Sequence, residues 1–325
     1  MPTRKTPGSA VRGMRPQWAT PYASLVAELE HATVDASGLP ARLDTETIIG
    51  WDFGNGTSAS YLGGTHAKSL HTGPDGQQWL FKHDSSGGAR AAAEAEASTV
   101  FAAVGLPAVP VYRTIVGGNH GSVQPLLSGA VHFPASPGSW TQVDVDAIVR
   151  YHVGTYAVSN HDGHPENLLR ASAGGMVAID LGQAFKHCHE DALSLSYNPV
   201  SRTVPHSLYR AHLAGALPAG VKLNVAAAYP VLTAFERIPD AQWRVMLHDT
   251  AHTGAKAGMN WTNAMRGRAA AKHGIAADNV TTEQIADAFL DAAVQRKQGL
   301  RQSFTDFFAG ELNIASAPTL LKAGH

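Results

Sequence analysis

The chain has 325 residues, of which 44% are hydrophobic and 16% charged, and its formal net charge is −1. This composition is typical of a globular protein rather than a disordered one, and the length allows two lobes or domains. The near-zero net charge provides no global basic field, which argues against nucleic acid as a partner. No apolar run reaches the ~18 residues of a membrane span. The single cysteine, Cys188, excludes an intramolecular disulfide framework and favours a cytoplasmic location.

Residues 1–45 predict an extension that precedes the folded lobes. Residues 1–15 contain several basic side chains among Pro, Gly and Ser, without the apolar stretch of a secretory signal. We expect a disordered tail there, with a basic arm that touches a partner as the alternative. Residues 21–33 have the apolar spacing of a short helix, and Gly38-Leu39-Pro40 then breaks it.

Residues 46–128 predict a small β-rich lobe. Residues 47–51 are a candidate strand, and residues 59–62 lead into a Gly63-Gly64 turn. A Pro-Asp-Gly turn follows, and the strand that returns from it contains Lys82. Glycines let backbone N–H groups approach phosphate oxygens closely, and a strand lysine supplies a positive charge for them. Each signal alone also fits an ordinary turn or a solvated strand end.

An alanine-rich helix is predicted over residues 89–103, and a Gly-Leu-Pro sequence after it marks its end. On this helix Glu94 or Glu96 can pair with Lys82 and fix the direction of its ammonium group. The alternative is that both glutamates are solvated helix charges.

Residues 109–116 and 122–127 predict a further hairpin around a Gly-Gly-Asn turn. The end of this hairpin is the natural hinge to a second lobe. We therefore assign two side chains of the hinge, Gln124 and Leu126, to a cofactor site between the lobes.

Residues 129–325 predict a second lobe that is mainly helical. A helix is expected over residues 144–159, and a later one opens at Thr281 with a capping box to Gln284. Residues 314–325 are expected to be loosely held. Two apolar stripes at helical spacing predict the core of this lobe. They consist of Ile148, Tyr151, Thr155 and Val158, and of Leu300, Phe304, Phe307 and Phe308.

The chemistry is concentrated in a loop and hairpin in the middle of the chain. Asp162 lies in a loop after the first of these helices, and residues 168–170 and 176–179 predict the two strands of a short hairpin. That hairpin presents Asn167 at one end and Asp180 at the other, close to Asp162. A phosphotransferase needs this set: one carboxylate orients the attacking hydroxyl, while an amide and a second carboxylate hold the magnesium that bridges the ATP phosphates.

Histidines near this loop leave a zinc site open as an alternative. The ligand types are suitable, but the closed Cys/His spacing of a structural zinc finger is absent. His164 is instead expected to brace the loop through hydrogen bonds. A hydrolase lacks a nucleophile, since no Gly-x-Ser-x-Gly elbow is present. The side chains in question are His161, His164, His187, His189 and Cys188.

Taken together, these segments resemble the HipA-like and phosphatidylinositol 3-/4-kinase-like branch of the protein-kinase-like fold. They cover residues 60–185 in the family's order, and the two aspartate motifs are the most specific. The resemblance implies an α+β, bilobal fold with a small β-rich N-lobe and a mainly helical C-lobe. The matching motifs are Gly63-Gly64-Thr65-His66-x-Lys68, Phe81-Lys82, a glutamate in the alanine-rich helix before Gly105-Leu106-Pro107, Asp162-x-His164-x-x-Asn167 and Ile179-Asp180-x-Gly182-x-Ala184-Phe185.

The same resemblance implies Mg²⁺ and ATP as cofactors. It makes Asp162 the catalytic base with His164 beside it, and it assigns Mg²⁺ to Asn167 and Asp180. Lys82 then binds the α- and β-phosphates, and Glu94 (or Glu96) pairs with it. The remaining cofactor contacts come from the turn that covers the phosphates and the residue after it, namely Gly63, Gly64, Thr65, His66 and Lys68.

Three classes of function follow from this pattern. The first is a kinase that transfers the γ-phosphoryl group to a hydroxyl acceptor, with protein or peptide Ser/Thr favoured over a small molecule or lipid. The second is a kinase-fold nucleotidyltransferase, which needs the same metal ligands. The third is a non-catalytic ATP-binding scaffold, which has no chemical need for Asp162, Asn167 and Asp180 together with Lys82.

Overall fold

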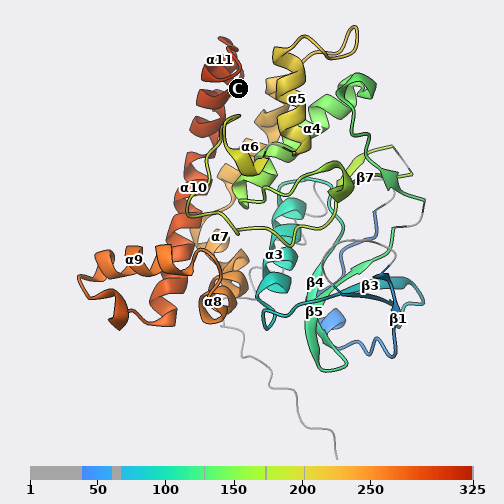
Figure 1. Cartoon of the computed structure of the whole chain (residues 1–325), viewed down its shortest axis with the longest axis vertical. Coiled ribbons are helices and arrows are strands. Elements are labelled where there is room, and N and C mark those ends of the chain that lie inside the picture. Colours follow the sequence, from blue (N-terminus) through green and yellow to red (C-terminus); the bar gives the residue numbers. More distant parts are fainter. Residues whose placement is uncertain (1–38, 61–66, 128, 173, 201, 324–325) are drawn as a thin grey trace, which may run out of the picture.

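We describe the protein from a computed structural model (Figure 1). The structure describes residues 39–60, 67–127, 129–172, 174–200 and 202–323. The predicted tail, the predicted helix at residues 21–33 and the turn at residues 63–66 lie outside these ranges.

The N-terminal part of the described chain forms a five-stranded antiparallel sheet in the order β1-β2-β3-β5-β4 (Figure 1). The predicted hairpin at Asp75 is confirmed, since its carboxylate accepts hydrogen bonds from the backbone of Gln77 and the indole of Trp79. The second predicted hairpin is also confirmed. The strands are β1 (Thr57–Ser58), β2 (Lys68–Thr72), β3 (Gln78–His83), β4 (Tyr112–Val116) and β5 (Asn119–Pro125).

The predicted strand at residues 47–51 is wrong, because this segment forms the short helix α2 (Thr45–Ile49). The carboxylate of Asp44 accepts a hydrogen bond from the backbone of Thr47 at 3.1 Å and so caps the helix. Ile48 is fully buried in a cluster with Trp79 and other aromatic side chains on one face of the sheet. A cap and tertiary packing thus override the β-preference of the β-branched residues.

Helix α3 (Ala89–Ala103) contacts β4 and β5 and also packs against the helical region through α8 (Figure 1). Its first turn is held by Asp84, which is buried and accepts a hydrogen bond from the backbone of Ala91 at 2.9 Å. Gly105 ends the segment with a positive φ of 72°, as the sequence predicts. This helix therefore ties the sheet to the rest of the molecule.

The remainder is mainly helical, so the predicted α+β class is confirmed. The long helix α10 contacts most of the other helices and forms one side of the molecule (Figure 1). Both predicted apolar stripes are buried, and the capping box between Thr281 and Gln284 is present. The helices are α4 (Gln142–Ala157), α5 (Val204–Leu213), α6 (Tyr229–Arg237), α7 (Asp240–Met246), α8 (His248–Ala257), α9 (Thr262–His273), α10 (Thr282–Gly310) and α11 (Ala317–Leu320).

A second, small antiparallel sheet has the order β6-β7-β8, and Ala178 at its end bonds to the segment between α3 and β4. It consists of β6 (Val131–His132), β7 (Leu168–Arg170) and β8 (Met176–Ala178). Short 3-10 turns lie at Pro137–Ser139, Pro165–Asn167, Asn198–Val200, Val225–Ala228 and Ala277–Asn279.

The C-terminal segment is not loosely held over its described residues. Helix α11 packs on α10, and both Ala317 and Leu321 are buried. The guanidinium group of Arg301 donates a hydrogen bond to the backbone oxygen of Leu321, which fixes that residue against α10. Within the described ranges, no helix combines the length and apolar character that a bilayer crossing requires.

Candidate active site

The loop that contains Asp162 starts where α4 ends. The chain turns sharply at Ser159, which has a positive φ of 48°, and the backbone of Asn160 donates to Thr155 at 2.8 Å. A Cβ atom at Gly163 would lie 2.8 Å from the hydroxyl oxygen of Tyr151. A side chain at this position would therefore push against Tyr151 of α4, because the loop passes directly over it.

The hairpin of β7 and β8 brings Asn167 and Asp180 together, as predicted. The backbone of Ile179 donates to the carbonyl oxygen of Asn167 at 2.9 Å, so Asp180 follows one residue beyond this bond. The amide nitrogen of Asn167 donates to the backbone oxygen of Asp162 at 2.7 Å and faces its carboxylate oxygen at 3.3 Å. Local chain geometry alone thus places the three candidate residues next to one another.

Lys82 is buried and links the sheet to this hairpin. Its Nζ lies 2.5 Å from Oε1 of Glu94 and 3.3 Å from Oδ1 of Asp180. Burial works to lower the pKa of Lys82, but the two carboxylates outweigh it and raise the pKa above its ordinary value. Lys82 therefore remains charged and is aimed at Asp180.

The structure decides between the two candidate glutamates. Glu94 is buried and pairs with Lys82, whereas Glu96 accepts hydrogen bonds from the backbone of Asp249 and Thr250 at 2.8 and 2.9 Å. Glu96 thus caps the first turn of α8 and takes no part in the lysine pair. Neither glutamate is a solvated helix charge.

Asp162 is half-exposed. Burial of its carboxyl group, together with the nearby charge of Asp180, raises its pKa above the ordinary value of an aspartate. The expectation that His164 braces the loop by hydrogen bonds is confirmed for its backbone but not for its ring. Its Nε2 lies 3.8 Å from Asp162 Oδ1, beyond hydrogen-bond range, and the brace comes from the His164 backbone, which donates to the Asp162 carbonyl at 2.9 Å.

The other predicted cofactor residues that the structure describes, Lys68, Gln124 and Leu126, lie in the five-stranded sheet or at its end. Lys68 faces Lys82 across β2 and β3, while Gln124 faces Leu80 across β5 and β3. Because side chains alternate along a strand, Gln124 lies on the same face as Lys82. The side-chain oxygen of Gln124 is buried and has no hydrogen-bond partner among the described residues. Leu126, at the end of this sheet, is 39% exposed.

Asn167 and Asp180 have the donor set that Mg²⁺ prefers. The nitrogen of the Asn167 amide is used by Asp162, which leaves its oxygen as the atom for a cation. Mg²⁺ is commonly bound by one or two protein oxygens together with phosphate oxygens and water. The pair therefore fits magnesium held jointly with a triphosphate.

The zinc alternative receives no support from the geometry. His161 pairs with Asp191, and His187 and His189 pair with Glu190. Among the residues that the structure describes, no group of three or more His, Cys, Asp or Glu side chains is placed to hold a metal ion.

Two contacts of the site escaped sequence reasoning. The hydroxyl of Ser122 donates to Oε2 of Glu94 at 2.6 Å and fixes the second oxygen of that carboxylate. This contact could have been expected from the strand register, which places Ser122 opposite Lys82. The second contact joins His161, Asp191 and Arg296, and no local pattern predicts it, since Arg296 lies 105 residues after Asp191.

A groove of about 940 Å³ opens beside the candidate base. Three segments line it: the strand region before α4, the Asp162 loop and the residues that lead into α5. Its lining includes Phe133, Asp162, His164, Glu166, Pro199 and Arg202.

The chain matches no protein-family model and no curated protein sequence. Among solved structures, it is similar to the Helicobacter pylori proinflammatory kinase CtkA, with 11% identity and a TM-score of 0.46. That alignment covers 79% of this chain and 97% of CtkA. The Golgi casein kinase aligns over 82% of this chain and 76% of its own, with 11% identity and a TM-score of 0.43. The function of this chain is therefore inferred from its own side chains.

Proposed function

We propose that this chain is an ATP-dependent kinase that transfers a γ-phosphoryl group to a hydroxyl acceptor. The observation that carries the proposal is the position of Lys82, whose buried ammonium group bridges Glu94 and Asp180. A lysine–glutamate pair directed at a metal-binding aspartate is what a kinase needs to hold the ATP phosphates. We place the chain in the HipA-like and phosphatidylinositol 3-/4-kinase-like branch, on the strength of its two aspartate motifs.

Each residue has a defined role in this proposal. Lys82 binds the α- and β-phosphates, and Asn167 and Asp180 hold Mg²⁺, which neutralises charge on the phosphate oxygens when it is bound. The buried side-chain oxygen of Gln124 has no partner among the residues that the structure describes, so it can accept a hydrogen bond from the amino group of the adenine. Asp162 orients the acceptor hydroxyl and receives its proton, and its raised pKa improves it as a base.

The groove beside Asp162 is the proposed acceptor site. Its volume of about 940 Å³ lies at the upper end of small-molecule pockets and admits a peptide segment. We therefore favour Ser or Thr in a protein or peptide as the acceptor, ahead of a small molecule or lipid.

Labelled ATP tests the reaction class. The purified chain is incubated with magnesium, a peptide library with one central Ser or Thr, and ATP labelled at either the γ- or the α-phosphate. Label from the γ position in the peptides or in the chain itself supports the kinase. Label from the α position would instead identify nucleotidyl transfer, and tight ATP binding without any transfer would identify a scaffold.

Replacement of the base tests its assignment. Asp162→Asn keeps the size of the side chain but cannot accept a proton, so we expect turnover to fall by about 10²–10⁴-fold. The affinity for ATP should stay within about twofold, because Asp162 does not contact Lys82 or Glu94. Turnover at the wild-type rate in Asp162→Asn would overturn the assignment.

A further inference from the structure

A buried ionic network includes His161, the residue that precedes the proposed catalytic base in the sequence. The carboxylate of Asp191 is only 1% exposed, and it faces Nε2 of His161 at 2.7 Å. The guanidinium group of Arg296 binds both oxygens of the same carboxylate, in the bidentate geometry that makes such pairs strong. His161 immediately precedes Asp162 in the sequence, so the network touches the base through a single peptide link.

The network joins three segments that are distant in the sequence. Arg296 comes from α10 and also donates to the backbone oxygens of Tyr156, at 3.1 Å, and of Cys188, at 3.2 Å. Its guanidinium carbon lies 4.8 Å from the centre of the Tyr156 ring. The end of α4, the segment at residues 188–191 and α10 are thereby held together at the point where the catalytic loop begins.

The charges in this network are stable at neutral pH. Burial works to raise the pKa of Asp191, but His161 and Arg296 outweigh it and hold the pKa below its ordinary value. Burial likewise works to lower the pKa of Arg296, and Asp191 outweighs it. A charged carboxylate therefore holds the His161 ring in one orientation.

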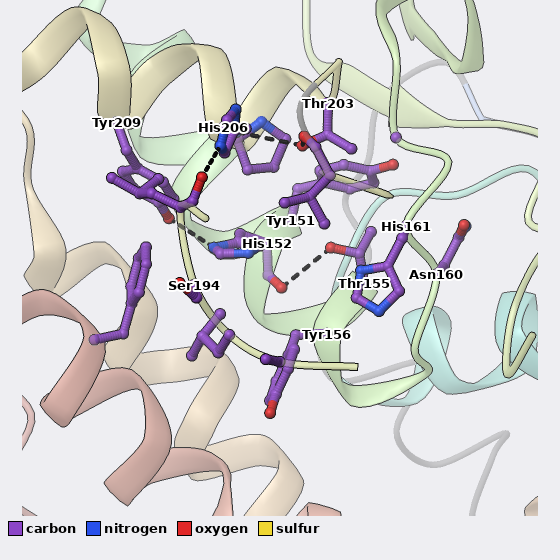
Figure 2. Close-up of a pocket in the computed structure, with 17 residues that line it drawn as sticks. Tyr151, His152, Thr155, Tyr156, Asn160, His161, Ser194, Thr203, His206 and Tyr209 are labelled. Carbon is purple, nitrogen blue, oxygen red and sulfur yellow. Dashed lines mark hydrogen bonds between the residues drawn. The ribbon is translucent and has the colours of Figure 1, made fainter. Parts of the chain in front are cut away.

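The other side of the loop is not close-packed. A partly open pocket with about 20 Å³ of free volume lies between α4, the catalytic loop and α5, and Figure 2 shows His161 and Asn160 on one side and His206 and Tyr209 on the other. Such a volume holds about one water molecule. The Nδ1 atom of His206 has no hydrogen-bond partner among the described residues. The amide of Asn167 restrains Asp162 directly, at 2.7 and 3.3 Å, whereas on the His161 side the restraining hydrogen bond is the one to Asp191.

We propose that Asp191 and Arg296 are positioning residues that set the direction of the Asp162 carboxylate through His161. The inference rests on the proposed function, because it takes Asp162 as the base. Loss of the network should disorient the base while it leaves the phosphate site around Lys82 unchanged. The segment that follows the metal-binding hairpin thus affects turnover, because Asp191 in it holds the ring of His161, the residue before the base.

Asp191→Asn tests the proposal, with Glu190→Gln as the matched control. Glu190 is the neighbouring residue, and its exposed carboxylate pairs with His187 at 2.9 Å. Asp191→Asn should lower kcat at least about tenfold, since a small misplacement of a catalytic group is costly. The KM for ATP should stay within about twofold in both variants, and kcat should not change in Glu190→Gln. A wild-type kcat, or an equal fall in kcat and in ATP affinity, would overturn the proposal.

A double variant separates positioning from a general structural role. If Asp191 acts through His161, then His161→Phe should lower kcat as much as Asp191→Asn, and the double variant should lose no more than either single one. Multiplicative losses would show that the two residues act independently and would overturn the proposal. If Asp191→Asn does not fold, His161→Phe removes only the last link of the network and is expected to give the same kcat and KM values.

Hydrogen exchange gives a readout that does not depend on catalysis. Asp191→Asn should raise the exchange rate of backbone amides at residues 160–164 at least about tenfold, whereas Glu190→Gln should not. Unchanged exchange there would overturn the inference even if phosphoryl transfer is confirmed. Absence of transfer by the wild-type protein would overturn the proposed function instead, so the two failures are distinguishable.

Discussion

The phosphate end and the acceptor end of the proposed active site are built differently. At the phosphate end, the side chains of Lys82 and Glu94 are 7% and 4% exposed and form a direct ion pair. At the acceptor end, the side chains of Asp162 and His164 are 44% and 34% exposed. The Oδ1 atom of Asp162 lies 3.8 Å from the Nε2 atom of His164. Under the proposed function, ATP would meet a preformed charged site, whereas the base would face a groove that can admit different acceptors.

The largest expected effect comes from the residue shared by both ends. Asp180→Asn removes the carboxylate that lies 3.3 Å from Lys82 and that would hold Mg²⁺. We expect turnover to fall by at least about 10³-fold, and the magnesium-dependent part of ATP binding to disappear. Titration of a fluorescent ATP analogue with and without magnesium measures the second effect.

The contrast between the phosphate end and the acceptor end would not hold if Asp180→Asn behaved like Asp162→Asn. Asp162→Asn should keep magnesium-dependent binding, because it changes only the acceptor end. Persistence of that binding in Asp180→Asn would show that Asp180 does not hold the metal, and that the phosphate end does not include it.

A smaller effect is expected from the two glutamates of α3, which form a matched pair. Glu94→Gln leaves the buried charge of Lys82 without its main partner and should destabilise the protein by about 3 kcal/mol. It should also weaken ATP binding, because the ammonium group loses its fixed direction. Glu96→Gln keeps an amide oxygen for the first turn of α8 and should cost about 1 kcal/mol.

Urea unfolding and ATP titration of both variants check this prediction. Equal losses of ATP affinity in Glu94→Gln and Glu96→Gln would mean that the effect passes through α3 as a whole. In that case the Lys82–Glu94 pair would not be the device that prepares the phosphate site.

The smallest expected effect at neutral pH concerns acid stability near the catalytic loop. Burial, together with His161 and His206, lowers the pKa of His152 to about 3, and its Nδ1 lies 2.9 Å from the hydroxyl of Tyr209. The unfolded chain therefore binds a proton at a higher pH than the folded protein does. Stability should fall as the pH drops from about 6.5 towards 3, by up to about 1.4 kcal/mol per pH unit.

His152→Gln should reduce this slope, since glutamine can replace the hydrogen bond but binds no proton. Urea unfolding at several pH values from 7.5 down to 4 measures it. The raised pKa of Lys82 contributes no slope in this range, because that group stays protonated in both states. An unchanged slope in His152→Gln would assign the acid sensitivity to another part of the molecule.

Most of what the sequence predicted correctly is local. The hairpin that carries Asn167 and Asp180, the helix before Asp162 and the capping box at Thr281 depend on residues close together in the chain. Their signals are turn residues, apolar spacing and a cap, which act over a few residues. The order of Asp162, Asn167 and Asp180 was therefore sufficient to place these three side chains together.

The tertiary structure decided the features that depend on distant packing. Glu94 rather than Glu96 pairs with Lys82, because the two glutamates face different neighbours. Only the placement of α8 shows that Glu96 already accepts hydrogen bonds from that helix. Residues 45–49 form a helix in the tertiary structure, since burial of Ile48 outweighs the local strand preference. The tertiary structure also joins Arg296 to Asp191 across 105 residues of chain. Contacts of this kind arise from the global fold, which local sequence signals do not specify.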